Sequence, residues 1–131
     1  ESFLSFGLFF MTAIAVLVIF LFLYAIVTPY DDYKLIFEDK NTAAAIGFGG
    51  AITGLSIPLY SALTHSVSYF DFAVWAVVAM VIQLVFAFIM TRTRGKYSVR
   101  KLIDEGVVSA GVLTAFISIS IGLLNAGSMS Y

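Results

Sequence analysis

The chain has 131 residues, of which 61% are hydrophobic and 11% are charged, and its formal net charge is −1. A small soluble domain cannot bury so many apolar side chains in its own core, so lipid must solvate part of this protein. The near-neutral charge gives no sign of nucleic-acid binding, and the absence of cysteine excludes disulfides, cysteine-ligated zinc and iron–sulfur clusters.

Four apolar runs are each long enough to cross a hydrocarbon core as a helix, which takes roughly 20 residues. In chain order they are Phe3–Val27, Thr42–Leu63, Phe72–Thr91 and Val107–Asn125. None of them contains a charged residue or a histidine in its interior. The sequence therefore predicts an all-α membrane protein, with residues 1–131 forming a single domain of four transmembrane helices.

The basic residues are confined to two of the three connectors. The first connector carries Lys34 and Lys40. The third carries the other five, which are Arg92, Arg94, Lys96, Arg100 and Lys101. Because Lys and Arg mark cytoplasmic loops, we expect both connectors inside and both termini outside. The third connector is predicted to contact anionic lipid headgroups, and a docking surface for a cytoplasmic partner is the alternative.

Small residues recur at every fourth position in the second and fourth runs. The two series are Gly50, Gly54, Pro58 and Ala62, and Ala110, Thr114, Ser118, Gly122 and Ala126. This spacing places each series on one helix face, and small side chains let two helix backbones approach closely. We expect the two runs to pack through these faces, and the alternative is that the faces line a pore or groove. Pro58 also removes one backbone hydrogen bond and can kink its helix.

Three amides are the most conspicuous polar groups at or within the runs. Asn41 precedes the second run, where it is expected to cap the helix, because Asn is a favoured N-cap residue. Gln83 and Asn125 lie inside the third and fourth runs. Polar groups in lipid tend to face other helices, so interhelical hydrogen bonds are expected for both. The alternative for all three is that they line a binding or conduction path.

The chain also has the pattern of an internal duplication. The tripeptide Lys-Leu-Ile occurs at 34–36 and again at 101–103, each time followed by acidic residues and then by a small-residue span. Each unit would hold two spans, with boundaries at about 1–66 and 67–131. Because two is an even number, the units are predicted to be parallel repeats related by an axis along the membrane normal.

Several segments, in order along nearly the whole chain, form a recognisable pattern. They are Ile26-Val27-Thr28-Pro29, Asn41-Thr42-Ala43-Ala44-Ala45, Gly50, Gly54, Ile57-Pro58-Leu59, Ser61-Ala62, Val81-Ile82-Gln83-Leu84 and Asn125-Ala126-Gly127-Ser128-Met129. Together they resemble the YjfL-like family of small bacterial inner-membrane proteins, a domain of unknown function. The resemblance implies a multi-pass protein of the bacterial inner membrane and brings no activity with it. One departure is Glu105-Gly106-Val107-Val108, where a second Asn-Thr-Ala-Ala would be expected.

Function is predicted mainly from what the runs lack. The sequence contains no nucleophile with a partner base, no paired acid and base and no phosphate loop, so we expect neither an enzyme nor a cofactor. We expect a non-catalytic subunit or scaffold of a membrane assembly, in contact with other membrane proteins or with further copies of itself. The alternative is a channel or transporter formed by an oligomer. Its transport would be passive, because no intramembrane charge is present to coordinate a coupled ion.

Overall fold

The computed structural model describes residues 2–130, and the regular elements in this range are all helical. In chain order they are α1 (Ser2–Val27), the π-helix η1 (Lys34–Glu38), α2 (Thr42–His65), α3 (Tyr69–Met90), the 3₁₀-helix η2 (Gly95–Tyr97), α4 (Val99–Asp104) and α5 (Val108–Ser128). Four of them, α1, α2, α3 and α5, are long and apolar enough to cross a membrane. The prediction of an all-α protein with four membrane-spanning helices is confirmed.

The long helices extend beyond some predicted boundaries because polar residues at their ends cap them or continue them. α3 begins at Tyr69 instead of Phe72, and the hydroxyl of Ser68 accepts a hydrogen bond from the N–H of Asp71 in its first turn. α5 continues past Asn125 to Ser128. A reading that stops an apolar run at its first polar residue misses such turns.

Two features of the connectors were not predicted. The first contains η1 and the third contains α4, whose N-cap is Ser98. Just before α2 and α5 the chain turns through a positive φ, at Lys40 (53°) and at Gly106 (79°). Both connectors thus end in the same way, in a short helix and a left-handed residue that leads into a long helix.

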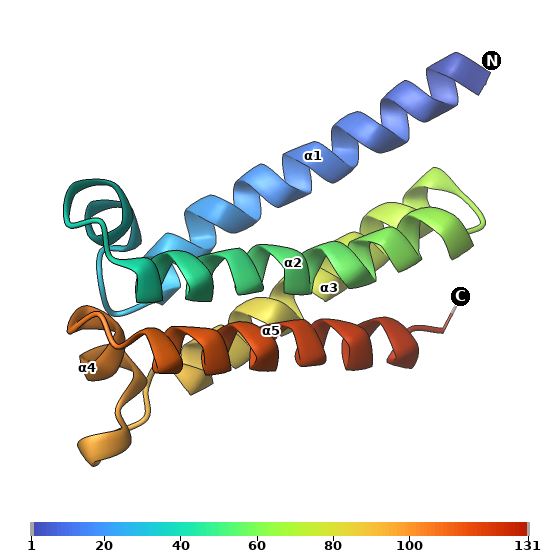
Figure 1. The fold of residues 1–131 in the computed structure, drawn as a ribbon. Helices are drawn as coiled ribbons and strands as arrows, with labels where there is room; N and C mark the ends of the chain where they lie inside the picture. The colour runs from blue at the N-terminus through green and yellow to red at the C-terminus, as the bar shows by residue number, and fades with distance from the viewer. Residues whose placement is uncertain (1, 131) are drawn as a thin grey trace.

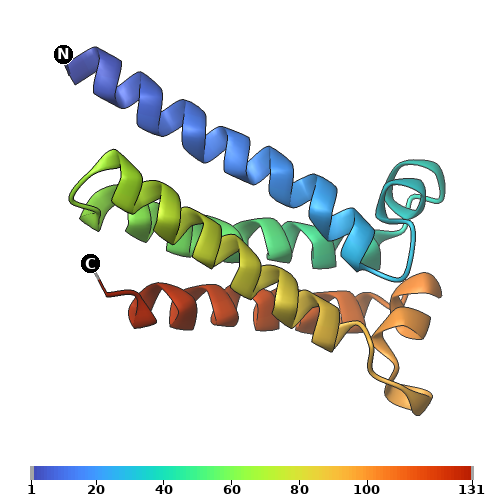
Figure 2. The ribbon, with the colours of Figure 1, turned by 180° about the vertical axis from the view of Figure 1, so that it is seen from behind.

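The four long helices are arranged unequally (Figures 1 and 2). α2 and α5 lie side by side along most of their lengths, and both start at the end of the molecule that holds η1 and α4. α3 crosses behind this pair and contacts the three other long helices. α1 packs against the bundle from Phe9 onward, while its first turns point away from the other helices.

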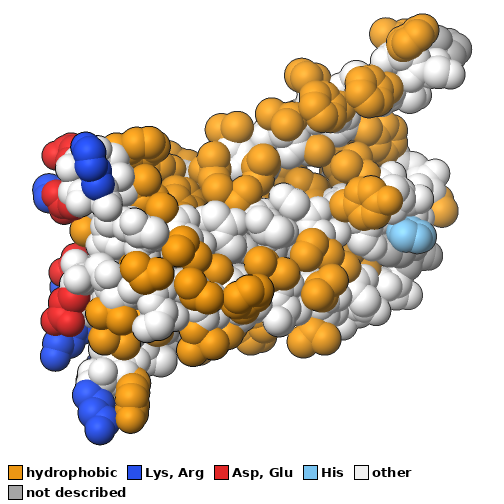
Figure 3. Space-filling view, viewed as in Figure 1, with side chains coloured by type: hydrophobic (Ala, Val, Ile, Leu, Met, Phe, Trp, Pro, Cys, Tyr) orange, Lys and Arg blue, Asp and Glu red, His pale blue; other side chains and the backbone are white. Residues whose placement is uncertain are grey.

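The main core combines aromatic rings with alanines. Phe20 and Phe72 are fully buried, and the rings of Tyr24 and Phe48 stack with centroids 5.0 Å apart. A second small cluster, made of Leu35, Ala43, Ala44 and Ile103, joins η1 and α4 of the connectors to the start of α2. Figure 3 shows Lys, Arg, Asp and Glu side chains gathered at this end of the molecule, with hydrophobic side chains along the rest of the visible face. α2 runs without interruption through Pro58.

Candidate functional site

The contact between α2 and α5 is close enough for the two backbones to touch. A methyl group added at Gly50 would stand 2.3 Å from the Cα of Ala115, and one added at Gly54 would stand 2.4 Å from the carbonyl oxygen of Ser118. The same holds from the other side, since a methyl at Gly111 would stand 2.4 Å from the carbonyl oxygen of Ala43. Side chains larger than hydrogen cannot occupy these positions unless the helices separate.

Pro58 and Gly122 are linked through the carbonyl group of Gly54. Pro58 has no N–H, so the Gly54 oxygen, four residues earlier, does not receive the helical hydrogen bond that residue 58 would otherwise donate. Gly122 of α5 packs against this oxygen, and a methyl there would stand 2.1 Å away from it. Close Cα–H contacts to carbonyl oxygens recur where helices meet at glycines, and each contributes a weak attraction.

The structure places most of the predicted small residues at this contact. Gly50, Gly54 and Pro58 are buried on α2. The buried residues of α5 are Gly111, Thr114, Ala115, Ser118, Gly122 and Asn125, so Gly111 and Ala115 were missed and Ala110 is only half buried. A strict spacing of four drifts by about 40° per step around a helix of 3.6 residues per turn. The buried residues of α5 are instead spaced alternately by three and four positions, and the spacing of four taken from the sequence does not describe this pattern.

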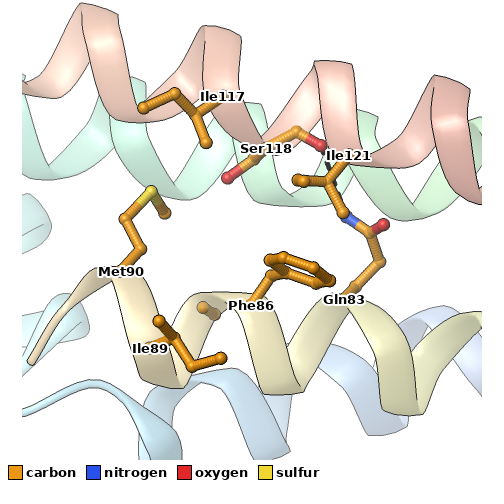
Figure 4. A pocket seen from close by; sticks show the side chains of 8 residues that line it. Gln83, Phe86, Ile89, Met90, Ile117, Ser118 and Ile121 are labelled. Carbon is orange, nitrogen blue, oxygen red and sulfur yellow. Dashed lines mark hydrogen bonds between the residues drawn. The ribbon is translucent and has the colours of Figure 1, made fainter.

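Gln83 and Asn125 form a buried polar connection between α3 and α5. The Gln83 Nε2 donates to the carbonyl oxygen of Ser118 at 3.4 Å, as Figure 4 shows. The Asn125 Nδ2 donates to the carbonyl oxygen of Ala79 at 3.3 Å and to the Gln83 Oε1 at 3.4 Å. Both side chains are buried. Their amide groups are therefore engaged between helices.

A small cavity of about 80 Å³ lies beside this connection, between α3 and α5. Figure 4 shows Gln83 and Ser118 at one side of it and apolar side chains around the rest. Phe86, Met90 and Ile117 are among those apolar neighbours. A cavity of this size and lining is suited to a small apolar group such as part of a lipid chain, and not to a hydrated ion.

Asn41 joins the two halves of the chain at the connector end. Its Oδ1 accepts the N–H of Ala44 at 3.0 Å, which makes it the N-cap of α2. Its Nδ2 donates to the carbonyl oxygen of Ile103 in α4 at 2.7 Å. The equivalent N-cap of α5 is Val107, which has no side-chain cap. The amide of Asn41 is thus occupied on both sides by protein groups.

Four of the five basic residues of the third connector lie around an open basin. Arg92, Arg94, Arg100 and Lys101 line this basin, whereas Lys96 lies outside it, with its ammonium group 5.2 Å from the ring centroid of Tyr97. The basin is bounded by the end of α3, by η2 and by α4. The sequence placed these residues in one connector, and the fold brings four of them around a common concavity.

One buried carboxylate escaped the sequence analysis. Asp32 is 1% exposed, and its Oδ2 accepts a hydrogen bond from the Thr28 hydroxyl at 2.5 Å. Burial raises the pKa of Asp32 to about 6; the Thr28 hydrogen bond opposes this shift and the neighbouring Asp31 adds to it. Burial and the charge of Asp32 also raise the pKa of Tyr30. In the sequence, Asp32 and Tyr30 look like residues of an ordinary polar turn.

A comparison with protein families identifies the group to which the chain is related. Residues 1–129 match the model of the family described as Domain of Unknown Function (DUF350). The chain belongs to the DUF350 family.

Relatives of this DUF350 chain extend the same conclusion. Two similar proteins, from Escherichia coli strain K12 and from Escherichia coli O157:H7, are both named UPF0719 inner membrane protein YjfL. Each is 34% identical over 131 residues, which cover 100% of this chain and 97% of the relative. No solved structure matches the chain. The resemblance seen in the sequence is confirmed, and the chain is a multi-pass inner-membrane protein of an uncharacterised family.

Proposed function

We propose that this protein is a non-catalytic subunit or scaffold of an inner-membrane assembly. The observation that carries the proposal is the backbone contact between α2 and α5 at Gly54, Ser118 and Gly122. This contact closes the faces that would otherwise line a path through the chain. The buried amides of Gln83 and Asn125 are engaged with protein groups, which is the arrangement of structural polar residues between membrane helices.

The exterior of α1 supports a role in assembly. Its amino-terminal half presents large apolar side chains to its surroundings, and Phe3 is 89% exposed. In a membrane such a surface contacts either lipid or the helices of another protein. Charged side chains, by contrast, lie in the connectors and turns, outside the apolar parts of the four spans. We therefore assign the chain no catalytic chemistry and no cofactor.

The proposal includes a topology of two parallel repeats, about 1–66 and 67–131, with both termini outside. Support comes from α2 and α5, which start at the same end and lie side by side. Further support comes from Lys40 and Gly106, which take the same left-handed conformation just before these helices. The positive-inside rule then puts the basic end in the cytoplasm.

Orientation is tested by placing cysteines in the cysteine-free chain. Val67 lies in the outer turn and Tyr97 in the third connector, and both are well exposed. In intact spheroplasts, Val67→Cys should react with a membrane-impermeant thiol reagent and Tyr97→Cys should not. Both should react after the membrane is opened. The opposite labelling pattern would reject the orientation.

Function is tested by two measurements on the full chain. Native gel electrophoresis of mild-detergent extracts should show a species larger than the monomer with stoichiometric composition, containing a partner or further copies. Liposomes with the purified protein should show no saturable flux of ions or small solutes above that of empty liposomes. Robust saturable flux would overturn the scaffold in favour of a passive oligomeric channel, and a lone monomer in native extracts would overturn assembly.

A further inference from the structure

The basin formed by the third connector has an unusual charge distribution. It encloses about 740 Å³, and four of its lining residues are basic, namely Arg92, Arg94, Arg100 and Lys101, while none is acidic. Within residues 2–130, none of the four forms an ion pair, since the pair that is present joins Lys34 to Asp39. A concave surface with several unneutralised cations attracts an anion, and guanidinium groups match the geometry of phosphate oxygens.

An apolar groove lies next to the basin along α1 and α3. It measures about 280 Å³, and its lining consists of Val27, Val81, Leu84, Val85 and Phe88. Val81, Val85 and Phe88 are each about half exposed. The groove therefore runs along the helix surfaces at the depth of the lipid chains, below a basic basin at the level of the headgroups.

Arg92 connects the two features. It lines the basin, and its Nη2 donates to the carbonyl oxygen of Val27 at 3.0 Å. Its guanidinium also lies over the ring of Phe88, 4.3 Å from the centroid. Val27 and Phe88 both line the groove. The polar basin and the apolar groove thus meet at a single side chain, which keeps its aliphatic stem in the apolar zone and its charge at the interface.

We propose that the basin and groove together form a binding site for one anionic glycerophospholipid. The phosphate lies in the basin against Arg94, Arg100 and Lys101, and an acyl chain follows the groove along Val85 and Phe88. A phospholipid separates charge and hydrocarbon in the same way as these two adjoining surfaces. A free phosphate would use the basin alone, and a general attraction to an anionic membrane would depend equally on every basic residue of the connector.

The experiment measures retention of added lipid by the purified, delipidated full chain, using native mass spectrometry in detergent. The probes are phosphatidylglycerol and phosphatidylcholine with identical acyl chains. We expect phosphatidylglycerol to bind with 1:1 stoichiometry and about tenfold more tightly than phosphatidylcholine. The double variant Arg94→Gln/Arg100→Gln should lose this preference, and both positions are exposed outside the spans, so the fold should persist.

Two further variants separate the site from its alternatives. Lys96→Gln removes one positive charge, half as many as the double variant, from the same connector but outside the basin, so its lipid affinity should equal that of the parent. Val85→Trp fills the groove without altering charge, so it should weaken phosphatidylglycerol binding about tenfold. Equal losses in Lys96→Gln and the double arginine variant would overturn the site. So would unchanged binding in Val85→Trp together with displacement of the lipid by inorganic phosphate.

Discussion

The helix pair α2–α5 and the pair α1–α3 show two different ways of packing in one membrane protein. α2 and α5 meet through glycines such as Gly54 and Gly122, and their backbones touch. α1 meets α3 through aromatic rings, for example Phe9 against Phe72 with centroids 5.3 Å apart, and its buried residues begin only at Ala13. In lipid no hydrophobic effect drives helices together, so close contact depends on small residues. α1 has few of them on its packing face, and its first turns stand apart from the bundle.

The largest effect is expected from a large side chain placed in the glycine contact between α2 and α5. Gly54→Leu would force a side chain into the backbone of α5, whose carbonyl group cannot rotate away. The cost should exceed the usual overpacking penalty of about 1–3 kcal/mol, and little folded protein should be recovered. The matched control is Gly49→Leu in the same helix, where a methyl meets nothing within 4 Å. If both variants melt like the parent in detergent, the α2–α5 contact does not hold the fold together.

The second prediction concerns the point where α1 is anchored to the connectors, near Asp32. Asp32→Asn keeps an acceptor for the Thr28 hydroxyl but cannot ionise; the other groups facing it are Tyr24, Tyr30 and Asp31. The pKa of Asp32 is about 6 in the folded chain against 3.8 ordinarily, so ionised Asp32 destabilises the fold. The penalty is absent below about pH 4, develops between about pH 4 and 6 and reaches roughly 3 kcal/mol above that.

Melting temperatures in detergent, measured from pH 4 to pH 7, test whether stability falls as Asp32 ionises. The parent should lose more stability than Asp32→Asn as the pH rises, and the variant should be the more stable of the two at pH 7. Asp31→Asn is the control, because it makes the same substitution at the neighbouring carboxylate, which is exposed. Parallel curves for parent and Asp32→Asn would show that Asp32 is not desolvated in the folded protein.

The third prediction compares the two halves of α1. Phe20→Ala empties a fully buried position, whereas Phe6→Ala trims a side chain that is 66% exposed. Water-soluble cores lose about 3–5 kcal/mol for such a change, and we expect about 2 kcal/mol for Phe20 because only packing contacts are lost in lipid. Phe6→Ala should stay within about 0.5 kcal/mol of the parent. Equal destabilisation by the two variants would mean that the amino-terminal half of α1 is packed against another molecule in detergent.

The smallest effect is expected at the polar connection between α3 and α5. Asn125→Leu removes the donors to Gln83 Oε1 and to the carbonyl oxygen of Ala79. Interhelical hydrogen bonds in membranes contribute about 0.6 kcal/mol on average, and up to about 1.7 kcal/mol, to the free energy of unfolding, so the variant should lose stability within this range. Ser128→Ala is the control, because its hydroxyl bonds only within its own helix, to Leu124. A loss of solute flux in Asn125→Leu liposomes, where the parent conducts, would instead assign Asn125 to a conducting path.

The sequence alone was sufficient for the number of spans and for the segregation of charge. Four helices long enough to span a membrane match the four predicted runs to within a few residues. This succeeds because each span depends only on a local property, the absence of charge over about 20 residues. The three amides can also be picked out in the sequence, since Gln83 and Asn125 stand out in apolar runs and Asn41 stands directly before one. Their hydrogen-bond partners on other helices were not determined by any local pattern.

What the sequence determined by itself is therefore the four long helices and the end of the bundle at which most of the charges lie. Only the tertiary structure decided that Gly111 and Ala115 are buried in α5 while Ala110 is only half buried, because small drifts in helical phase accumulate along a contact. It also decided the burial of Asp32, whose neighbour Asp31 has the same side chain and remains exposed. Burial, contact and concavity depend on residues distant in the chain, and composition over a local window does not contain that information.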